Sequence, residues 1–90
     1  MKDKDGGKNR QRSIRLSGVR RIIISSQFIR LDALLKFASI ASTGGEAKML
    51  IQNGDVFVDG EPCTQRGKKI ISGGIVRIGE TTLVVKQRSD

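Results

Sequence analysis

Apolar residues recur with two different spacings along this 90-residue chain, and these spacings predict the order of its elements. The first apolar segment is the β-branched run Ile22–Ile24, which is bounded by polar residues and predicts a buried strand over residues 21–25. The stretch before it is rich in Lys, Arg, Gly, Asn and Ser and has too few apolar side chains to order a chain. We therefore interpret residues 1–19 as a flexible basic arm and residues 20–90 as the folded domain.

Helical spacing follows the first predicted strand. Four apolar side chains fall at i, i+3, i+4 and i+7 and so share one stripe of a helix: Leu31, Leu34, Leu35 and Ala38. The same geometry predicts that Asp32, Lys36 and Ser39 are turned outward. Asp32 also suits the first turn of this helix, where the helix dipole is positive.

A second helix is predicted to begin after Thr43. Thr43 and Glu46 have the spacing of a capping box, in which the threonine hydroxyl accepts from the glutamate amide and the glutamate side chain reaches back. Three apolar residues form the buried stripe of this helix: Ala47, Leu50 and Ile51. Asn53–Gly54 then supplies the left-handed stop that commonly ends a helix.

After Gly54 the apolar spacing changes to a period of two, which is typical of strands. Val56–Val58, the tight-turn pair Asp59–Gly60 and a short return over residues 61–63 predict a hairpin. Further strands are expected at residues 69–71, 75–78 and 82–85, separated by glycine-containing turns. An N-terminal strand, two short packed helices and a small, mostly antiparallel sheet together predict an α+β fold.

Basic residues are concentrated near the N-terminus. The chain has 17 Lys and Arg against 9 Asp and Glu, which gives a net charge of +8. Residues 1–27 hold 8 basic and 2 acidic side chains (+6), whereas residues 28–90 hold 9 and 7 (+2). Such an arm can neutralise phosphates without regard to sequence, or it can simply keep the chain soluble.

The composition excludes several classes of function. Without histidine and with one cysteine, Cys63, the chain has no His-based acid or base, no internal disulfide and no Cys/His zinc site. A lone cysteine in so small a domain suits a reducing, cytoplasmic compartment. The apolar runs are too short to span a bilayer. We expect no enzyme activity, no metal or cofactor, no small-molecule substrate and no membrane partner.

Four segments carry a resemblance to a known family: Arg30–Asp32 with Leu35, Thr43–Ala47 with Leu50–Ile51, Gly54–Gly60, and Gly73 with Val76 and Ile78. In this order and spacing they resemble the S-four RNA-binding domain, also called the α-L motif. The resemblance covers residues 30–78, and the short chain is similar to the small stand-alone YaaA-type members. It implies a protein that binds structured RNA without catalysing a reaction.

The start of the second predicted helix departs from the family pattern. Many members have arginines that grip phosphate there, whereas this chain has Gly44 and Gly45. Glycines leave the first amides of a helix uncovered, so one hypothesis is that these amides meet a phosphate. The alternative is that the pair only lets the chain turn sharply between two packed helices. Asp59 also stands where asparagine is commoner, and it adds a negative charge near the expected RNA surface.

The resemblance places an RNA-facing surface along the second helix and the β-turn region that follows. Nine residues are candidates for it: Arg30, Lys36, Thr43, Gly44, Gly45, Lys48, Arg66, Lys68 and Lys69. The three aromatic residues, Phe28, Phe37 and Phe57, lie in or beside apolar stripes and are expected in the core. We therefore expect no base-stacking platform, and recognition through phosphates and the shape of folded RNA.

These observations predict a non-catalytic RNA-binding protein that grips structured RNA during ribosome assembly or translation. Ribosomal RNA as the target is implied by the resemblance alone, and ribosomal proteins are further candidate partners. The absence of the two helix-start arginines leaves an alternative open. In that alternative the domain is a protein-interaction module that docks on a ribosomal or replication protein and binds RNA weakly and nonspecifically.

Overall fold

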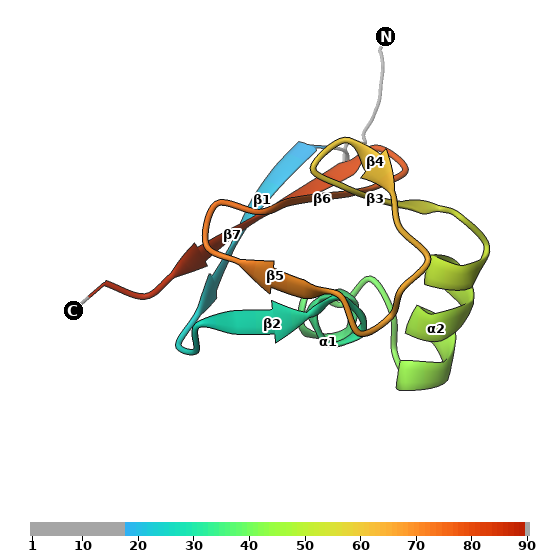
Figure 1. Cartoon of the computed structure of the whole chain (residues 1–90), viewed down its shortest axis with the longest axis horizontal. Coiled ribbons are helices and arrows are strands. Elements are labelled where there is room, and N and C mark those ends of the chain that lie inside the picture. The colour runs from blue at the N-terminus through green and yellow to red at the C-terminus, as the bar shows by residue number, and fades with distance from the viewer. Residues whose placement is uncertain (1–17, 90) are drawn as a thin grey trace, which may run out of the picture.

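The computed structural model describes residues 18–89, which form seven strands and two helices (Figure 1). The elements follow in this order: β1 (Gly18–Ile24), β2 (Phe28–Arg30), α1 (Leu31–Phe37), α2 (Gly44–Gln52), β3 (Val56–Val58), β4 (Glu61–Pro62), β5 (Lys69–Ile71), β6 (Ile75–Ile78) and β7 (Thr81–Gln87). The predicted α+β fold is confirmed. Strand β2 was not predicted, because three residues are too short for a period of two to show.

Five of the strands form one sheet in the order β1-β7-β6-β3-β4. Strand β1 pairs with β7 in parallel, and the other neighbours pair antiparallel. Strands β2 and β5 form a separate antiparallel ribbon, which lies below the larger sheet in Figure 1 and runs directly into α1. The protein therefore carries a two-stranded ribbon and two adjacent helices on one side of its main sheet.

The predicted helical stripes form the centre of the core. Leu31, Leu34 and Leu35 of α1 are fully buried, and Ala47 and Ile51 of α2 pack with them. Leu50 is only partly buried, at the edge of this core. The sheet contributes four side chains that are also fully buried: Val56, Val76, Leu83 and Val85.

The predicted hairpin turn is confirmed at Asp59–Gly60. Both residues have positive φ angles, 50° and 88°, as a two-residue type I′ turn requires. The Asp59 carboxylate accepts a hydrogen bond from the Ile75 amide at 3.0 Å, so it also fixes the start of β6. The side chain at position 59 therefore has a structural use, which an asparagine Oδ1 could also serve because it accepts hydrogen bonds as well.

The N-terminal boundary differs slightly from the one expected. Strand β1 begins at Gly18, so two residues assigned to the arm belong to the sheet. The rest of the expected arm, residues 1–17, lies outside the described residues, as does Asp90. Within residues 18–89, no helix is long and apolar enough to cross a membrane.

Candidate nucleic-acid interface

Asp32 holds two of the predicted cationic residues together. Its carboxylate accepts from Arg66 Nε at 2.9 Å, and from Arg30 Nε and a terminal nitrogen of Arg30 at 3.2 Å each. The carboxylate is buried, whereas the two guanidinium groups remain about half exposed. We call Arg30 and Arg66 the arginine pair. The prediction that Asp32 is turned outward is wrong, because these two arginines fold over it.

The same contact region satisfies the first amides of α1. The Leu31 amide donates to the Lys68 carbonyl at 2.8 Å, and the Asp32 amide donates to the Arg66 carbonyl at 3.0 Å. The Ala33 amide donates to the Asp32 carboxylate at 2.8 Å. Helix starts leave such donors without partners inside the helix, so the loop between β4 and β5 is fixed to α1 by its main chain as well.

These contacts determine the ionisation of Asp32. Burial by itself raises the pKa of this carboxyl group, but the hydrogen bonds from Arg66, Arg30 and the Ala33 amide together outweigh burial. The pKa therefore lies below its ordinary value of 3.8, and Asp32 is ionised at neutral pH. The arginine pair thus has a permanent anionic anchor.

The start of α2 has the predicted cap. Thr43 Oγ1 accepts from the Glu46 amide at 3.1 Å, which confirms the threonine half of the capping box. The Glu46 carboxylate accepts from the Ser42 amide at 2.6 Å, one residue earlier than in the usual box. The amides of Gly44 and Gly45 donate no hydrogen bond within residues 18–89. Among the described residues, two donors at the positive end of the helix dipole are therefore without a partner.

Arg66 lies beside this helix start. A Cβ atom added at Gly44 would stand 3.8 Å from a terminal nitrogen of Arg66, an ordinary contact distance. Neither Gly44 nor Gly45 has a positive φ, and an added Cβ at Gly45 would clash with nothing. The sharp-turn interpretation of the glycine pair therefore finds no support in the backbone. A guanidinium from the neighbouring loop therefore lies beside this helix start.

The β2–β5 ribbon places two more exposed side chains near Arg30. Arg30 pairs across the ribbon with Lys69, and Phe28 pairs with Ile71. Phe28 is 39% exposed, and the Lys69 ammonium lies 4.8 Å from its ring centroid. Phe37, at the end of α1, is 62% exposed, and Phe57 is half-buried beneath Arg77. The prediction that all three phenylalanines lie in the core is therefore wrong.

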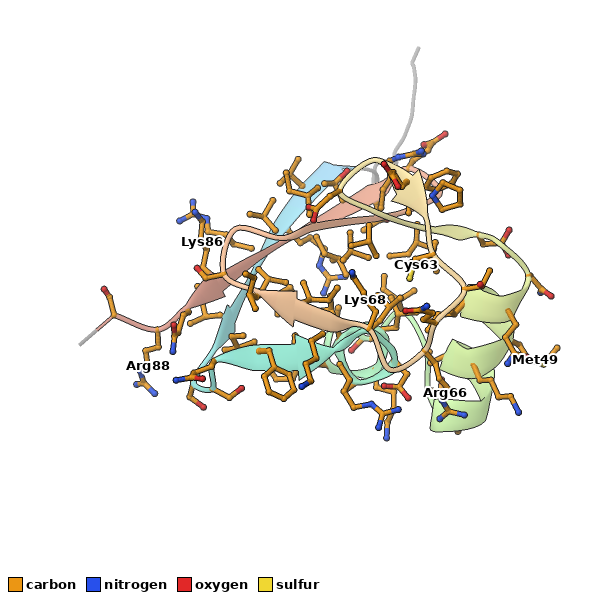
Figure 2. All side chains as sticks on the ribbon, in the orientation of Figure 1. Met49, Cys63, Arg66, Lys68, Lys86 and Arg88 are labelled. Carbon is orange, nitrogen blue, oxygen red and sulfur yellow. The ribbon has the colours of Figure 1, made fainter. Side chains whose placement is uncertain are left out.

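The remaining predicted lysines lie in different places. Lys48 is exposed one turn after Gly44, on the same face of α2. Lys36 is exposed in the last turn of α1, one turn after Asp32. Lys68 faces the main sheet and lines a depression beneath the β3–β4 turn with Asp59, whereas Arg66 extends toward α2 (Figure 2). Lys68 is thus separated from the arginine pair.

The depression lined by Lys68 is formed by the β3–β4 turn and the loop that follows it. It encloses about 440 Å³, and Glu61, Cys63 and Gln65 line it as well. Nothing in residues 18–89 groups three potential metal ligands there or elsewhere. The cationic surface with the best-defined geometry is instead the one that joins the arginine pair, the α2 start and the ribbon.

Sequence reasoning missed the residues that organise this surface. Asp32 was assigned to the outer face of a helix, although it lies two positions after Arg30 and could have been paired with it. Phe28 and Ile71 were missed because β2 was not predicted. Without a strand at residues 28–30, nothing in the sequence indicates that Phe28 and Arg30 lie on the same face.

The chain is similar to known proteins over most of its folded part. A family model for the S4 domain matches residues 22–86. The chain is also similar to the probable ribosome maturation protein RlbA of Bacillus subtilis (strain 168), with 37% identity over 57 residues. That alignment covers 63% of this chain and 80% of the relative. Because the family match spans most of the chain, including both helices and the ribbon, the protein belongs to the S4 domain family.

Proposed function

We propose that this protein is a non-catalytic, cytoplasmic RNA-binding protein that grips structured ribosomal RNA through its phosphates during ribosome assembly or translation. The observation that carries the proposal is the position of Arg66, which lies beside the free amides of the α2 start while Asp32 holds it with Arg30. Membership of the S4 domain family supports RNA as the ligand. The printed name of the relative, a probable ribosome maturation protein, supports a role in ribosome assembly.

The hydrogen-bonding capacity of the arginine pair suits phosphate. A guanidinium has five N–H donors in a rigid fork, and Arg66 directs only its Nε donor to Asp32. Its terminal nitrogens remain for a phosphate that approaches the α2 start, where the Gly44 and Gly45 amides add two donors. Arg66 and these amides therefore form a site of the kind that charge-assisted hydrogen bonds make strong.

Neighbouring cations extend this site along the RNA backbone. Lys48 follows on α2, and Lys69 lies opposite Arg30 on the ribbon. If about 4 to 6 phosphates are engaged, the logarithm of affinity falls with the logarithm of salt concentration with a slope of roughly −3 to −5. Lys68 lines the depression beneath the β3–β4 turn and Lys36 lies in the last turn of α1, so we expect these two lysines to contribute less.

Fluorescence anisotropy tests the proposal with the full chain, a folded ribosomal RNA hairpin and an unstructured strand of equal length at two salt concentrations. Arg66→Met should weaken hairpin binding by about 10-fold or more, because a charge-assisted contact to phosphate is lost. Arg88→Met removes the same charge from the far end of the molecule, as Figure 2 shows, and is the matched control. Equal losses in the two variants, or no preference for the hairpin, would overturn the proposal.

The N-terminal arm has a separate, accessory role in this proposal. Residues 1–17 contain six basic side chains, and we propose that they attract RNA without regard to its shape. Replacing all six by glutamine in the full chain should lower affinity for hairpin and strand alike and reduce the salt dependence. A loss of the preference for the hairpin would show instead that the arm, and not the domain, recognises folded RNA.

One observation favours the alternative of a protein-interaction module. Ile23 of β1 and Phe37 of α1 are exposed apolar side chains that line a shallow depression of about 200 Å³ with Ile29. Cosedimentation with purified ribosomal subunits distinguishes the two functions. Charge reversal of Arg66, Lys68 and Lys69 to glutamate should abolish cosedimentation if RNA is the ligand, and Phe37→Ser should abolish it if a protein is.

A further inference from the structure

The outer face of the β2–β5 ribbon combines apolar and cationic side chains in a fixed order. Alternation along each strand turns Ile29 and Ile70 toward the core, so the outer face consists of Phe28 and Arg30 from β2 and Lys69 and Ile71 from β5. The pairing register sets Phe28 opposite Ile71 and Arg30 opposite Lys69. One half of this face is therefore apolar and the other half is cationic.

Both apolar side chains of the outer ribbon face are accessible. Ile71 is 62% exposed and Phe28 is 39% exposed, and the Lys69 ammonium that lies over the ring is carried on a flexible stem. The ammonium can turn from the ring to an anion without any change in the main chain. Phe28 then presents an aromatic surface next to a cation.

Charge around this face is of one sign. The strands and the turns beside them, residues 25–30 and 66–74, contain no aspartate or glutamate. Within residues 18–89, the carboxylate paired with the ribbon residue Arg30 is Asp32, which is buried and neutralised by the arginine pair. The surroundings therefore complement a ligand that is flat and apolar on one part and anionic on the other.

We propose that the outer ribbon face binds an unpaired nucleobase, which packs on Phe28 and Ile71 while the flanking phosphates meet Lys69 and Arg30. The site rests on the proposed RNA-binding function and adds a second kind of contact to it. Base stacking on an aromatic ring is tolerant of base identity, since every base has a π face. Arg30 belongs both to this face and to the arginine pair, so the unpaired nucleotide lies next to the phosphates held at the α2 start.

The test compares three RNAs with the same stem and the full-length protein. One stem is blunt, the second carries a short unpaired 3′ extension, and the third carries the same extension made of abasic nucleotides. The extension is flexible enough to reach the ribbon from the stem, and the abasic version keeps its phosphates while lacking its bases. Wild-type protein should bind the extension with bases about 5-fold to 10-fold more tightly than the abasic one.

Two leucine variants test whether the ribbon causes the difference in affinity between the base-containing and the abasic RNA. Phe28→Leu keeps an apolar side chain but removes the aromatic face, so it should abolish the discrimination between bases and abasic units. Phe37→Leu makes the same change at the exposed aromatic residue of α1 and should preserve it. Affinities for the RNAs are compared within each variant. A change in protein stability affects binding to all of the RNAs equally, so it cannot by itself remove the discrimination between bases and abasic units.

The outcomes separate this inference from the proposed function. If wild-type protein binds all three RNAs but does not distinguish the base-containing from the abasic extension, the stacking site is overturned and the phosphate site stands. If discrimination survives Phe28→Leu, the bases contact another part of the protein and the ribbon assignment is overturned. If wild-type protein binds none of the three RNAs, both proposals are overturned.

Discussion

Arg66 Nε lies 2.9 Å from Asp32 Oδ2, and the Arg66 carbonyl accepts from the Asp32 amide at 3.0 Å, although 34 positions separate the two residues. The loop between β4 and β5 is thus joined to the start of α1 by its side chain and its main chain together. A mobile surface arginine loses much conformational entropy when it binds phosphate. Because the contacts with Asp32 already restrict Arg66, part of this entropy is lost before any ligand binds. In the proposed function, Asp32 therefore positions Arg66 for a phosphate.

Asp32→Asn tests this preparation directly. The change removes the buried charge but keeps the side-chain shape, and it should lower the free energy of unfolding by about 1–3 kcal/mol because the arginine contacts lose their anion. The protein also gains one unit of positive charge, which by itself favours RNA. If Asp32 positions the arginine pair, the ratio of hairpin to single-strand affinity nevertheless falls in anisotropy measurements. An unchanged ratio with tighter binding to both RNAs would show that only net charge matters.

The lowered pKa of Asp32 predicts how stability depends on pH. A carboxyl group whose pKa is lower in the folded than in the unfolded protein stabilises the fold above the unfolded pKa, and this contribution is lost as pH falls through the folded pKa. Urea unfolding of wild type and Asp32→Asn should therefore differ most above about pH 4 and converge in more acidic solution. A difference that stays constant down to the most acidic pH would contradict the ion-pair assignment.

Gly74 is predicted to be the glycine that the fold tolerates least well as alanine. An added Cβ would lie 2.7 Å from Ile70 Cγ2 and 3.0 Å from the Ile71 carbonyl oxygen, and Gly74 is buried. Gly74→Ala should lower the free energy of unfolding by about 1–3 kcal/mol, as overpacking does in other cores. Gly44→Ala is the matched control, since its Cβ would meet only an ordinary contact at 3.8 Å. Similar unfolding midpoints for the two variants would show that the ribbon turn adapts.

Gly45→Leu separates the role of the α2 start in binding from any role in folding. Gly45 is exposed and a Cβ fits there, so thermal stability should be unchanged or slightly higher. The leucine would cover the free amides, and hairpin affinity should fall by about 5-fold or more because the phosphate loses its closest approach. Gln52→Leu adds the same side chain at the other end of α2 and should leave affinity unchanged. If Gly45→Leu and wild type bind the hairpin with equal affinity, the Gly44 and Gly45 amides do not contact the phosphate.

Much of the fold followed from local pattern. The stripe of Leu31, Leu34 and Leu35 identified α1, and the Thr43 cap and the Gly54 stop set the ends of α2 within a residue or two. Local rules suffice there because helical spacing, caps and tight turns are decided by residues three or four positions apart. The parallel pairing of β1 with β7 has no such signal, since its two strands lie at opposite ends of the chain.

Some features of the candidate site can be predicted from the sequence, whereas others require the three-dimensional structure. Four features follow from the sequence alone: the α+β order, the excess of cations, the absence of histidine and the absence of arginines at the α2 start. Three others depend on the fold: Arg66 lies beside Gly44, Asp32 is buried under the arginine pair, and Phe28 stays at the surface of a ribbon. Each of these depends on contacts between distant segments. A carboxylate on a helical face has the same local pattern whether solvent or an arginine from another loop covers it.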